Sequence, residues 1–322
     1  MGWMFAASAT IAIAQATLTP PQAADPLTAE IETEDADRFA ALFERTGGQP
    51  TAEQIQQVYL DRGSYGVRVF TPNRIVGASN LAAAVRAKPD IYAKAIRTCL
   101  PIVKETTAEL RATYLAFRGL FPERLLPRIY LVVGAGNSGG TAGPGAQVLG
   151  LETLCGIADT PDQLRTLLRG FYAHETVHVL QGEPDVEKTG NILLGSVLME
   201  GAADFIATLV TGRQMDPARA AWAAPREAEL WRRFEADLAS VRVLRWDQIR
   251  PGTAAAKSLN RWVANYGSAP EGWPGELGYW MGQRIWQRWY DRQPDKQAAL
   301  EAMIDLKDPE AVLATGRFTA KP

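Results

Sequence analysis

Two histidines four residues apart are the residues of this sequence best suited to chemistry. Residues 174–178 read HETVH, an H-E-x-x-H pattern in which Glu175 follows the first histidine. On a helix, positions i and i+4 share one face, so the imidazoles of His174 and His178 can reach one metal ion. Glu175 is turned off that face but stays beside the metal, where it can act on a bound water. The pattern predicts a catalytic zinc site.

The pattern is specific because the chain holds only two histidines. Two histidines placed at random would have this spacing roughly once in a hundred trials. The flanking residues also predict a helix, with Thr160 as N-cap, Pro161 at the first position and Gln163 completing a capping box. Gly182 is a plausible end of this helix. The alternative is a helix that carries two histidines and a glutamate by coincidence.

A catalytic zinc ion needs a third protein ligand, and with no histidine left it must be a carboxylate or a thiolate. Glu200 and Asp204 lie four residues apart within an otherwise apolar, helically spaced segment. A buried carboxylate is costly unless a metal or hydrogen bonds compensate it. We therefore expect Glu200 to bind the metal and Asp204 to hold a ligand histidine by its other ring nitrogen. Gly201 and Ala202 would let this helix approach the histidine helix closely. The alternative is that both carboxylates lie on a solvated edge.

H-E-x-x-H followed by E-x-x-x-D on a second helix resembles the gluzincin metallopeptidases, of which thermolysin is the familiar member. Four segments carry a closer resemblance: NSGGT at 137–141, HETVH, EGAADF at 200–205 and LGYWMG at 277–282. They look like a bacterial family of predicted zinc-dependent proteases that is defined as a domain of unknown function. The likeness extends from about Ile31 to the C-terminal helices. It implies a zincin-like fold and a peptide or protein substrate.

Further site residues are expected around the metal. A strand beside the zinc can bind substrate backbone by edge pairing, and glycines allow close approach. We assign this role to the glycine-rich segment, Asn137, Ser138, Gly139, Gly140 and Thr141. The oxyanion formed during hydrolysis needs a donor besides zinc. Tyr279, from the LGYWMG segment, is the first candidate, and Arg284 is the second.

Three other patterns have weaker interpretations. Residues 134–139 match G-x-G-x-x-G after a strand, but that dinucleotide-binding pattern must open a helix, and the glycines and proline at 140–145 forbid one. Residues 136–140 look like the nucleophile loop of a serine protease, but both histidines are committed elsewhere. The tryptophan and tyrosine residues at 273–290 can form a ligand cage, although their helical spacing favours a packed core.

The expected fold class is α+β, mostly helical, with a small β-sheet whose edge strand borders the active site. Residues 31–116 look helical, with a capping box at Thr51 and an interruption at Pro101. Strands are expected at 129–133 and 147–151, and helices follow. No internal repeat or clear linker is visible, so residues 31–322 are expected to form a single domain.

The N-terminal residues indicate export. The apolar run at 3–14 is followed by Ala14-Gln15-Ala16, a site of the kind that signal peptidase reads. We predict a signal peptide over 1–16, a loose segment over 17–30 and a periplasmic or secreted protein. Residues 1–2 lack a basic side chain, so the alternative is a plain apolar tail. Cys99 and Cys155 can pair in an oxidising compartment or remain separate buried thiols, and the sequence leaves both open.

Composition narrows the function further. Lys and Arg number 34 against 36 Asp and Glu, without a basic cluster, which argues against nucleic-acid binding. The apolar run at 3–14 is too short for a stable membrane span. We expect a zinc-dependent hydrolase, a peptidase, in which Glu175 activates a zinc-bound water. The alternatives are a zinc-stabilised non-catalytic binding module and a non-peptide amidase or esterase. The oligomeric state and the cleavage specificity stay open.

Overall fold

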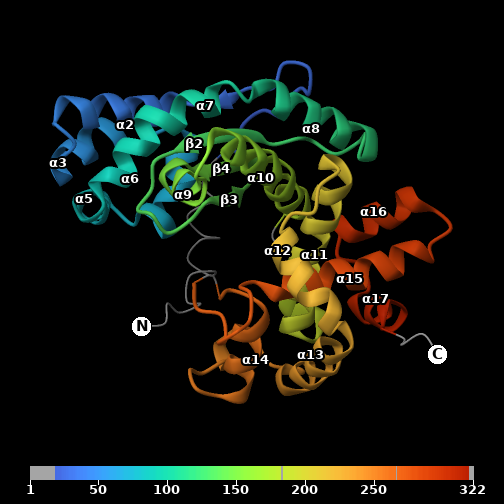
Figure 1. Ribbon diagram of the computed structural model, residues 1–322. Coiled ribbons are helices and arrows are strands. Elements are labelled where there is room, and N and C mark those ends of the chain that lie inside the picture. Colours follow the sequence, from blue (N-terminus) through green and yellow to red (C-terminus); the bar gives the residue numbers. More distant parts are fainter. Residues whose placement is uncertain (1–18, 183, 266, 319–322) are drawn as a thin grey trace. The chain divides into compact units, whose positions relative to one another are not determined.

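The computed structural model describes residues 19–182, 184–265 and 267–318 (Figure 1). The predicted signal peptide over 1–16 lies outside these residues. The chain forms two compact units, one that ends at Gly182 and one that follows it. The single domain expected over 31–322 thus contains parts of two compact units. The two units are described in turn.

The first unit combines helices with a small sheet, which confirms a mostly helical α+β architecture. Its helical elements before the sheet are α2 (Glu34–Arg45), α3 (Ala52–Ile55), η1 (Gln56–Leu60), α4 (Tyr65–Phe70), η2 (Thr71–Ile75), α5 (Ala78–Ala87), α6 (Pro89–Lys94), η3 (Ala95–Cys99), α7 (Leu100–Lys104) and α8 (Thr107–Leu120). The elements η1, η2 and η3 are π-helical turns. The predicted capping box at Thr51 is present at the start of α3.

The sheet of the described residues has four strands in the order β1-β2-β4-β3. They are β1 (Ile31–Glu32), β2 (Arg128–Val132), β3 (Gly140–Gly143) and β4 (Ala146–Gly150). β1, β2 and β4 run parallel, whereas β3 pairs antiparallel with β4 and lies at the edge. The two central strands are buried along nearly their whole length, which explains their continuous apolar sequences. Both were predicted to within one residue, whereas β1 was not.

Two helices complete the first unit, α9 (Leu151–Ile157) and α10 (Pro161–Gln181). The start of α10 is the predicted one, because Thr160 and Gln163 form the capping box and Pro161 occupies the first turn. Gly182 ends the helix with a φ of 70°, a value that glycine adopts without strain. The HETVH segment therefore lies in the last two turns of a well-defined helix.

The predicted interruption at Pro101 is wrong. Residues 89–104 stay helical through η3 and α7, and the helix ends just before Thr106. A π turn inserts one extra residue into the hydrogen-bond ladder, and η3 ends two residues before Pro101, which lies in the first turn of α7. This local change accommodates a residue that has no N–H to donate.

Apart from an isolated bridge between Asn191 and Arg242, the second unit has only helical regular elements among its described residues. It comprises η4 (Val186–Thr189), α11 (Ile192–Thr211), α12 (Pro217–Ala223), η5 (Ala224–Arg226), α13 (Glu227–Val241), η6 (Trp246–Gln248), α14 (Ala254–Trp262), α15 (Leu277–Asp291), α16 (Lys296–Ile304) and α17 (Pro309–Gly316). By length and composition α11 resembles a membrane-spanning helix, but 78% of its most apolar window is buried in protein. Burial of this kind is typical of a core helix.

Close packing of α11 against α15 forms the centre of the second unit. Any side chain at Gly201 would clash with the backbone of Gly282, and one at Gly282 would clash with the Val197 carbonyl. The indole of Trp286 donates a hydrogen bond of 2.8 Å to the Leu198 carbonyl. The sequence indicated that Gly201 serves contact with the histidine helix, whereas its backbone packs against α15.

A disulfide answers the question that the sequence left open about the cysteines. Cys99 at the end of η3 is bonded to Cys155 in α9, with Cα atoms 5.9 Å apart. The bond closes a loop of 56 residues that contains α8, β2, β3 and β4. It thus ties together the two ends of the segment that builds the sheet.

Removal of this cross-link should destabilise the protein by making its unfolded chain less restricted. For a loop of this length, the loss expected for Cys99→Ala combined with Cys155→Ala is about 4 kcal/mol in the free energy of unfolding. Chemical denaturation of the variant and the oxidised parent measures it. Equal unfolding midpoints would contradict the disulfide.

Candidate metal centre

The two histidines of α10 direct the same ring nitrogen toward one point. The Nε2 atoms of His174 and His178 lie 3.0 Å apart, and the ring planes are inclined by 79°. Two nitrogen ligands about 2.0–2.1 Å from a tetrahedral zinc ion would be about 3.3 Å apart. The observed separation is close to this value, so the pair fits two corners of a zinc site without a change of rotamer.

The protonation of His178 follows from its neighbour at the end of α10. The Nδ1 of His178 lies 2.9 Å from Oε1 of Gln181, three residues further along the helix. An amide oxygen only accepts, so Nδ1–H donates this bond and Nε2 keeps its lone pair in the neutral ring. Metal-binding histidines usually have such a partner on the ring nitrogen that faces away from the metal. Gln181 was not among the residues predicted from the sequence, although the sequence shows its i+3 spacing from His178.

Glu175 lies beside the glycine-rich edge strand. A Cβ atom at Gly140 would stand 3.2 Å from Oε1 of Glu175, so only glycine leaves this space free. In the same segment Ser138 donates a hydrogen bond of 2.7 Å to the Gly140 carbonyl. The structure therefore brings the 137–141 segment next to the carboxylate of the H-E-x-x-H pattern. Binding of a substrate there stays a prediction.

A buried carboxylate holds the loop that leads into β3. Glu152, at the start of α9, accepts hydrogen bonds from the backbone N–H groups of Gly134 and Gly136, at 2.8 and 2.9 Å. Burial raises the pKa of Glu152, and the two N–H donors oppose this shift only in part. The loop leads into β3 and opens no helix, as predicted, and two of its amides donate to a carboxylate.

Arg74 is a residue of this site that the sequence gave no reason to choose. It lies in η2, and its carbonyl accepts a 3.0 Å hydrogen bond from the side-chain amide of Asn137. Burial lowers the pKa of the Arg74 guanidinium, and the negative charge of Glu175 partly restores it. Within the described part of the chain, the guanidinium has no ion-pair partner at bonding distance. Arg74 is thus a cation whose charge interacts with that of Glu175.

The remaining predicted residues belong to the second unit. Glu200 is a half-buried residue of α11, and its role as the third metal ligand stays a prediction. Asp204, one turn later, is only 3% exposed and lies 3.6 Å from Nη1 of Arg219. The Arg219 guanidinium also lies over the ring of Tyr279, at 5.1 Å from its centroid. Arg219 thus links two predicted site residues, and the proposed bond from Asp204 to a histidine stays a prediction.

Arg284 is engaged in an ion pair within the second unit. Its Nε donates to Glu227 at 2.9 Å, and Arg288 donates to the same oxygen at 2.6 Å. Burial raises the pKa of Glu227, but the hydrogen bonds and charges of the two arginines outweigh it and lower this pKa. To contact a substrate as well, Arg284 would have to share the N–H groups that it donates to Glu227.

Comparison with known proteins adds no assignment for this site. No protein-family model matches the chain, and neither curated proteins nor solved structures gave a match. The chemistry of the site therefore has to be judged from its own residues.

Loss of the Gln181 acceptor should weaken metal binding. Gln181→Met keeps the side-chain length but no longer accepts from Nδ1 of His178, so the ring can turn and change tautomer. We expect zinc affinity about 10- to 100-fold lower in a competition titration with a chelating dye. Gln57→Met, at an exposed position of η1, is the control and should match the parent. Unchanged affinity of Gln181→Met would show that this bond does not orient a ligand.

Proposed function

We propose that the protein is a zinc-dependent hydrolase, a peptidase of the gluzincin type with a zincin-like fold. In this proposal His174, His178 and Glu200 bind the zinc ion. One observation carries it: the two Nε2 atoms lie 3.0 Å apart, with the lone pair of His178 fixed by Gln181. Glu175 next to this pair supports an enzyme over a zinc-stabilised binding module, because that glutamate is not needed to bind metal.

In the proposed hydrolysis, a bound zinc ion and Glu175 have different roles. A bound zinc ion would lower the pKa of a coordinated water toward neutrality and polarise the substrate carbonyl. The Glu175 carboxylate takes up the proton of the attacking water and passes it to the leaving amine nitrogen. The space above Gly140 keeps the carboxylate accessible to these atoms.

The edge strand β3 is suited to hold the substrate. Its inner edge pairs with β4, and within the described sheet no strand pairs with its outer edge. A peptide could add there as a further strand through main-chain hydrogen bonds. We propose that residues 137–141 bind substrate in this way, with the scissile bond beside Glu175. Peptide substrates are favoured over other amides or esters because an extended peptide backbone can form hydrogen bonds with the N–H and C=O groups on the outer edge of β3.

A charged donor near Glu175 can stabilise the oxyanion. Arg74 belongs to the same unit as Glu175 and interacts with its charge. Tyr279 and Arg284 remain candidates, but Arg284 already binds Glu227. We therefore place Arg74 first among the donors of the proposed reaction.

The Cys99–Cys155 bond supports a periplasmic or secreted location. Disulfides persist in oxidising compartments and are rare in the cytosol. Together with the A-x-A sequence at 14–16, it favours an exported protein.

Glu175→Gln should separate metal binding from catalysis. Glutamine has nearly the same shape but cannot accept the proton, so zinc content should stay at about one ion per chain while kcat falls about 10²–10⁴-fold. Elemental analysis and a peptide-library digest measure both. Glu53→Gln, exposed on α3, is the matched control. Loss of zinc would make Glu175 a ligand, and full activity would assign the base to another group.

Glu200→Ala should remove most of the bound zinc, because only two protein ligands would remain. Asp204→Asn should weaken zinc binding only about 10- to 100-fold, as expected for a residue that acts through a ligand. Glu235→Ala, at a partly exposed site of α13 outside the proposed metal centre, serves as the control. Zinc affinity unchanged by Glu200→Ala would place the third ligand elsewhere and end the gluzincin assignment.

Arg74→Met should lower kcat with little change in KM, since the guanidinium acts on charge that develops during the reaction. Loss of one oxyanion donor costs about 10²–10³-fold in rate. Steady-state kinetics of Arg74→Met and Tyr279→Phe compare the two candidates directly, with exposed Arg62→Met as the control. A normal kcat for Arg74→Met with a reduced one for Tyr279→Phe would assign the role to the tyrosine.

A further inference from the structure

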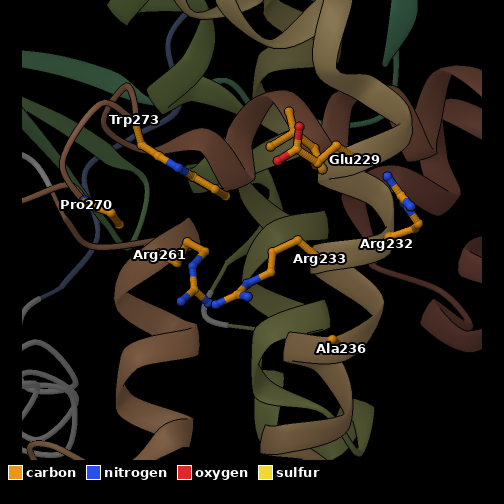
Figure 2. Close-up of a pocket in the computed structure, with 8 residues that line it drawn as sticks. Glu229, Arg232, Arg233, Ala236, Arg261, Pro270 and Trp273 are labelled. Atoms are coloured by element: carbon orange, nitrogen blue, oxygen red, sulfur yellow. The ribbon is translucent and has the colours of Figure 1, made fainter.

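The second unit contains a cavity, open to solvent, that the proposed hydrolysis does not use. It has a volume of about 640 Å³ and lies between α13, α14 and the loop that leads to α15 (Figure 2). Pockets of this size commonly bind small organic molecules. Its lining residues are Glu229, Leu230, Arg232, Arg233, Ala236, Arg261, Pro270 and Trp273.

Two arginines of the cavity share a single buried carboxylate. Asp237 is 6% exposed, and one of its oxygens, Oδ2, lies 2.6 Å from Nη1 of Arg261 and 3.6 Å from Nε of Arg233. The same carboxylate accepts hydrogen bonds from the Trp262 indole and the Ser258 hydroxyl, both at 2.9 Å. Asp237 is thus fixed from several sides and binds both guanidinium groups. Figure 2 shows the ends of Arg233 and Arg261 lying close together.

The charges around the cavity do not cancel. Arg232, Arg233 and Arg261 carry three positive charges, and Glu229 and Asp237 carry two negative ones, which leaves one positive charge. Among the described residues, only Asp237 is within hydrogen-bond or ion-pair distance of the guanidinium nitrogens of Arg233 and Arg261. Several N–H donors of this pair are therefore free for a ligand. A guanidinium fork matches the two coplanar oxygens of a carboxylate.

The rest of the lining is suited to a flat apolar group. The Trp273 indole extends from the loop toward the centre of the cavity (Figure 2). It is held by edge-on contact with Trp262, at 5.7 Å between ring centroids, and by Arg261 at 5.9 Å. Leu230 and Pro270 add further apolar surface. An aromatic wall beside an anion site favours a ligand that has both groups.

We propose that this cavity binds an organic monocarboxylate, with its carboxylate on Arg233 and Arg261 and its apolar part along Trp273. The single excess positive charge matches a monoanion. A phosphate dianion would bring a second negative charge toward Glu229, so the cavity disfavours it. The site lies wholly in the second unit and does not depend on the proposed peptidase activity.

Calorimetric titration of the full chain with benzoate tests the site. Arg233→Gln and Arg261→Gln should each weaken benzoate binding about tenfold or more, because each removes a charged donor. Arg242→Gln makes the same change of charge at an exposed position outside the cavity, and it should bind benzoate like the parent. If Arg261→Gln unfolds by freeing Asp237, Arg233→Gln decides the outcome, since Arg233 is half exposed.

Two further probes define the ligand class. Benzamide has the ring without the charge and should not bind measurably, and inorganic phosphate should bind more weakly than benzoate. Absence of benzoate binding, or benzoate binding unaffected by Arg233→Gln, would overturn the proposal. If benzamide bound as tightly as benzoate, the negative charge of the ligand would not matter and an anion site would be excluded. If phosphate bound more tightly than benzoate, the ligand class would not be a carboxylate.

Discussion

The hydrogen bond between His178 and Gln181 is the interaction on which the candidate metal site depends. It places the proton of His178 on Nδ1, so the lone pair of Nε2 is left to face Nε2 of His174 at 3.0 Å. At this distance either a proton on Nε2 of His174 or a metal ion can bridge the two nitrogen atoms. The rigid spacing of α10, set by its cap at Thr160 and its end at Gly182, keeps them together. The helix thus preforms two corners of a site for a cation.

The scaffold around α10 fixes the other groups of the first unit. Glu152 holds the start of the glycine-rich loop, and the disulfide to Cys155 secures the helix on which Glu152 lies. Holding the loop in this way costs free energy, because burial of Glu152 disfavours the charged form of its carboxyl group and raises its pKa. The benefit is a defined edge strand in which Gly140 lies against Glu175. Groups held in advance need little reorganisation during a reaction.

Local signals allowed the sequence to predict some elements and not others. The start of α10 was predictable because its capping box and its N-terminal proline lie within four consecutive residues, so the signal is local in the sequence. The strand β3 was not delimited, because its glycines have low strand propensity and it is ordered by pairing with β4. The disulfide could not be inferred without a Cα distance, and Arg74 reaches Glu175 only through the tertiary fold. The packing of Gly201 against α15 was not predicted, because a small residue in a sequence does not reveal which helix packs against it.

The central claim is that His174, His178 and Glu200 bind one zinc ion. The most direct test is a crystal of the zinc-loaded protein measured above and below the zinc absorption edge. The account predicts one anomalous peak about 2.0–2.1 Å from Nε2 of both histidines and a similar distance from a carboxylate oxygen of Glu200. No peak at the histidine pair would contradict the metal site. A peak there with a ligand other than Glu200 would contradict the proposed donor set.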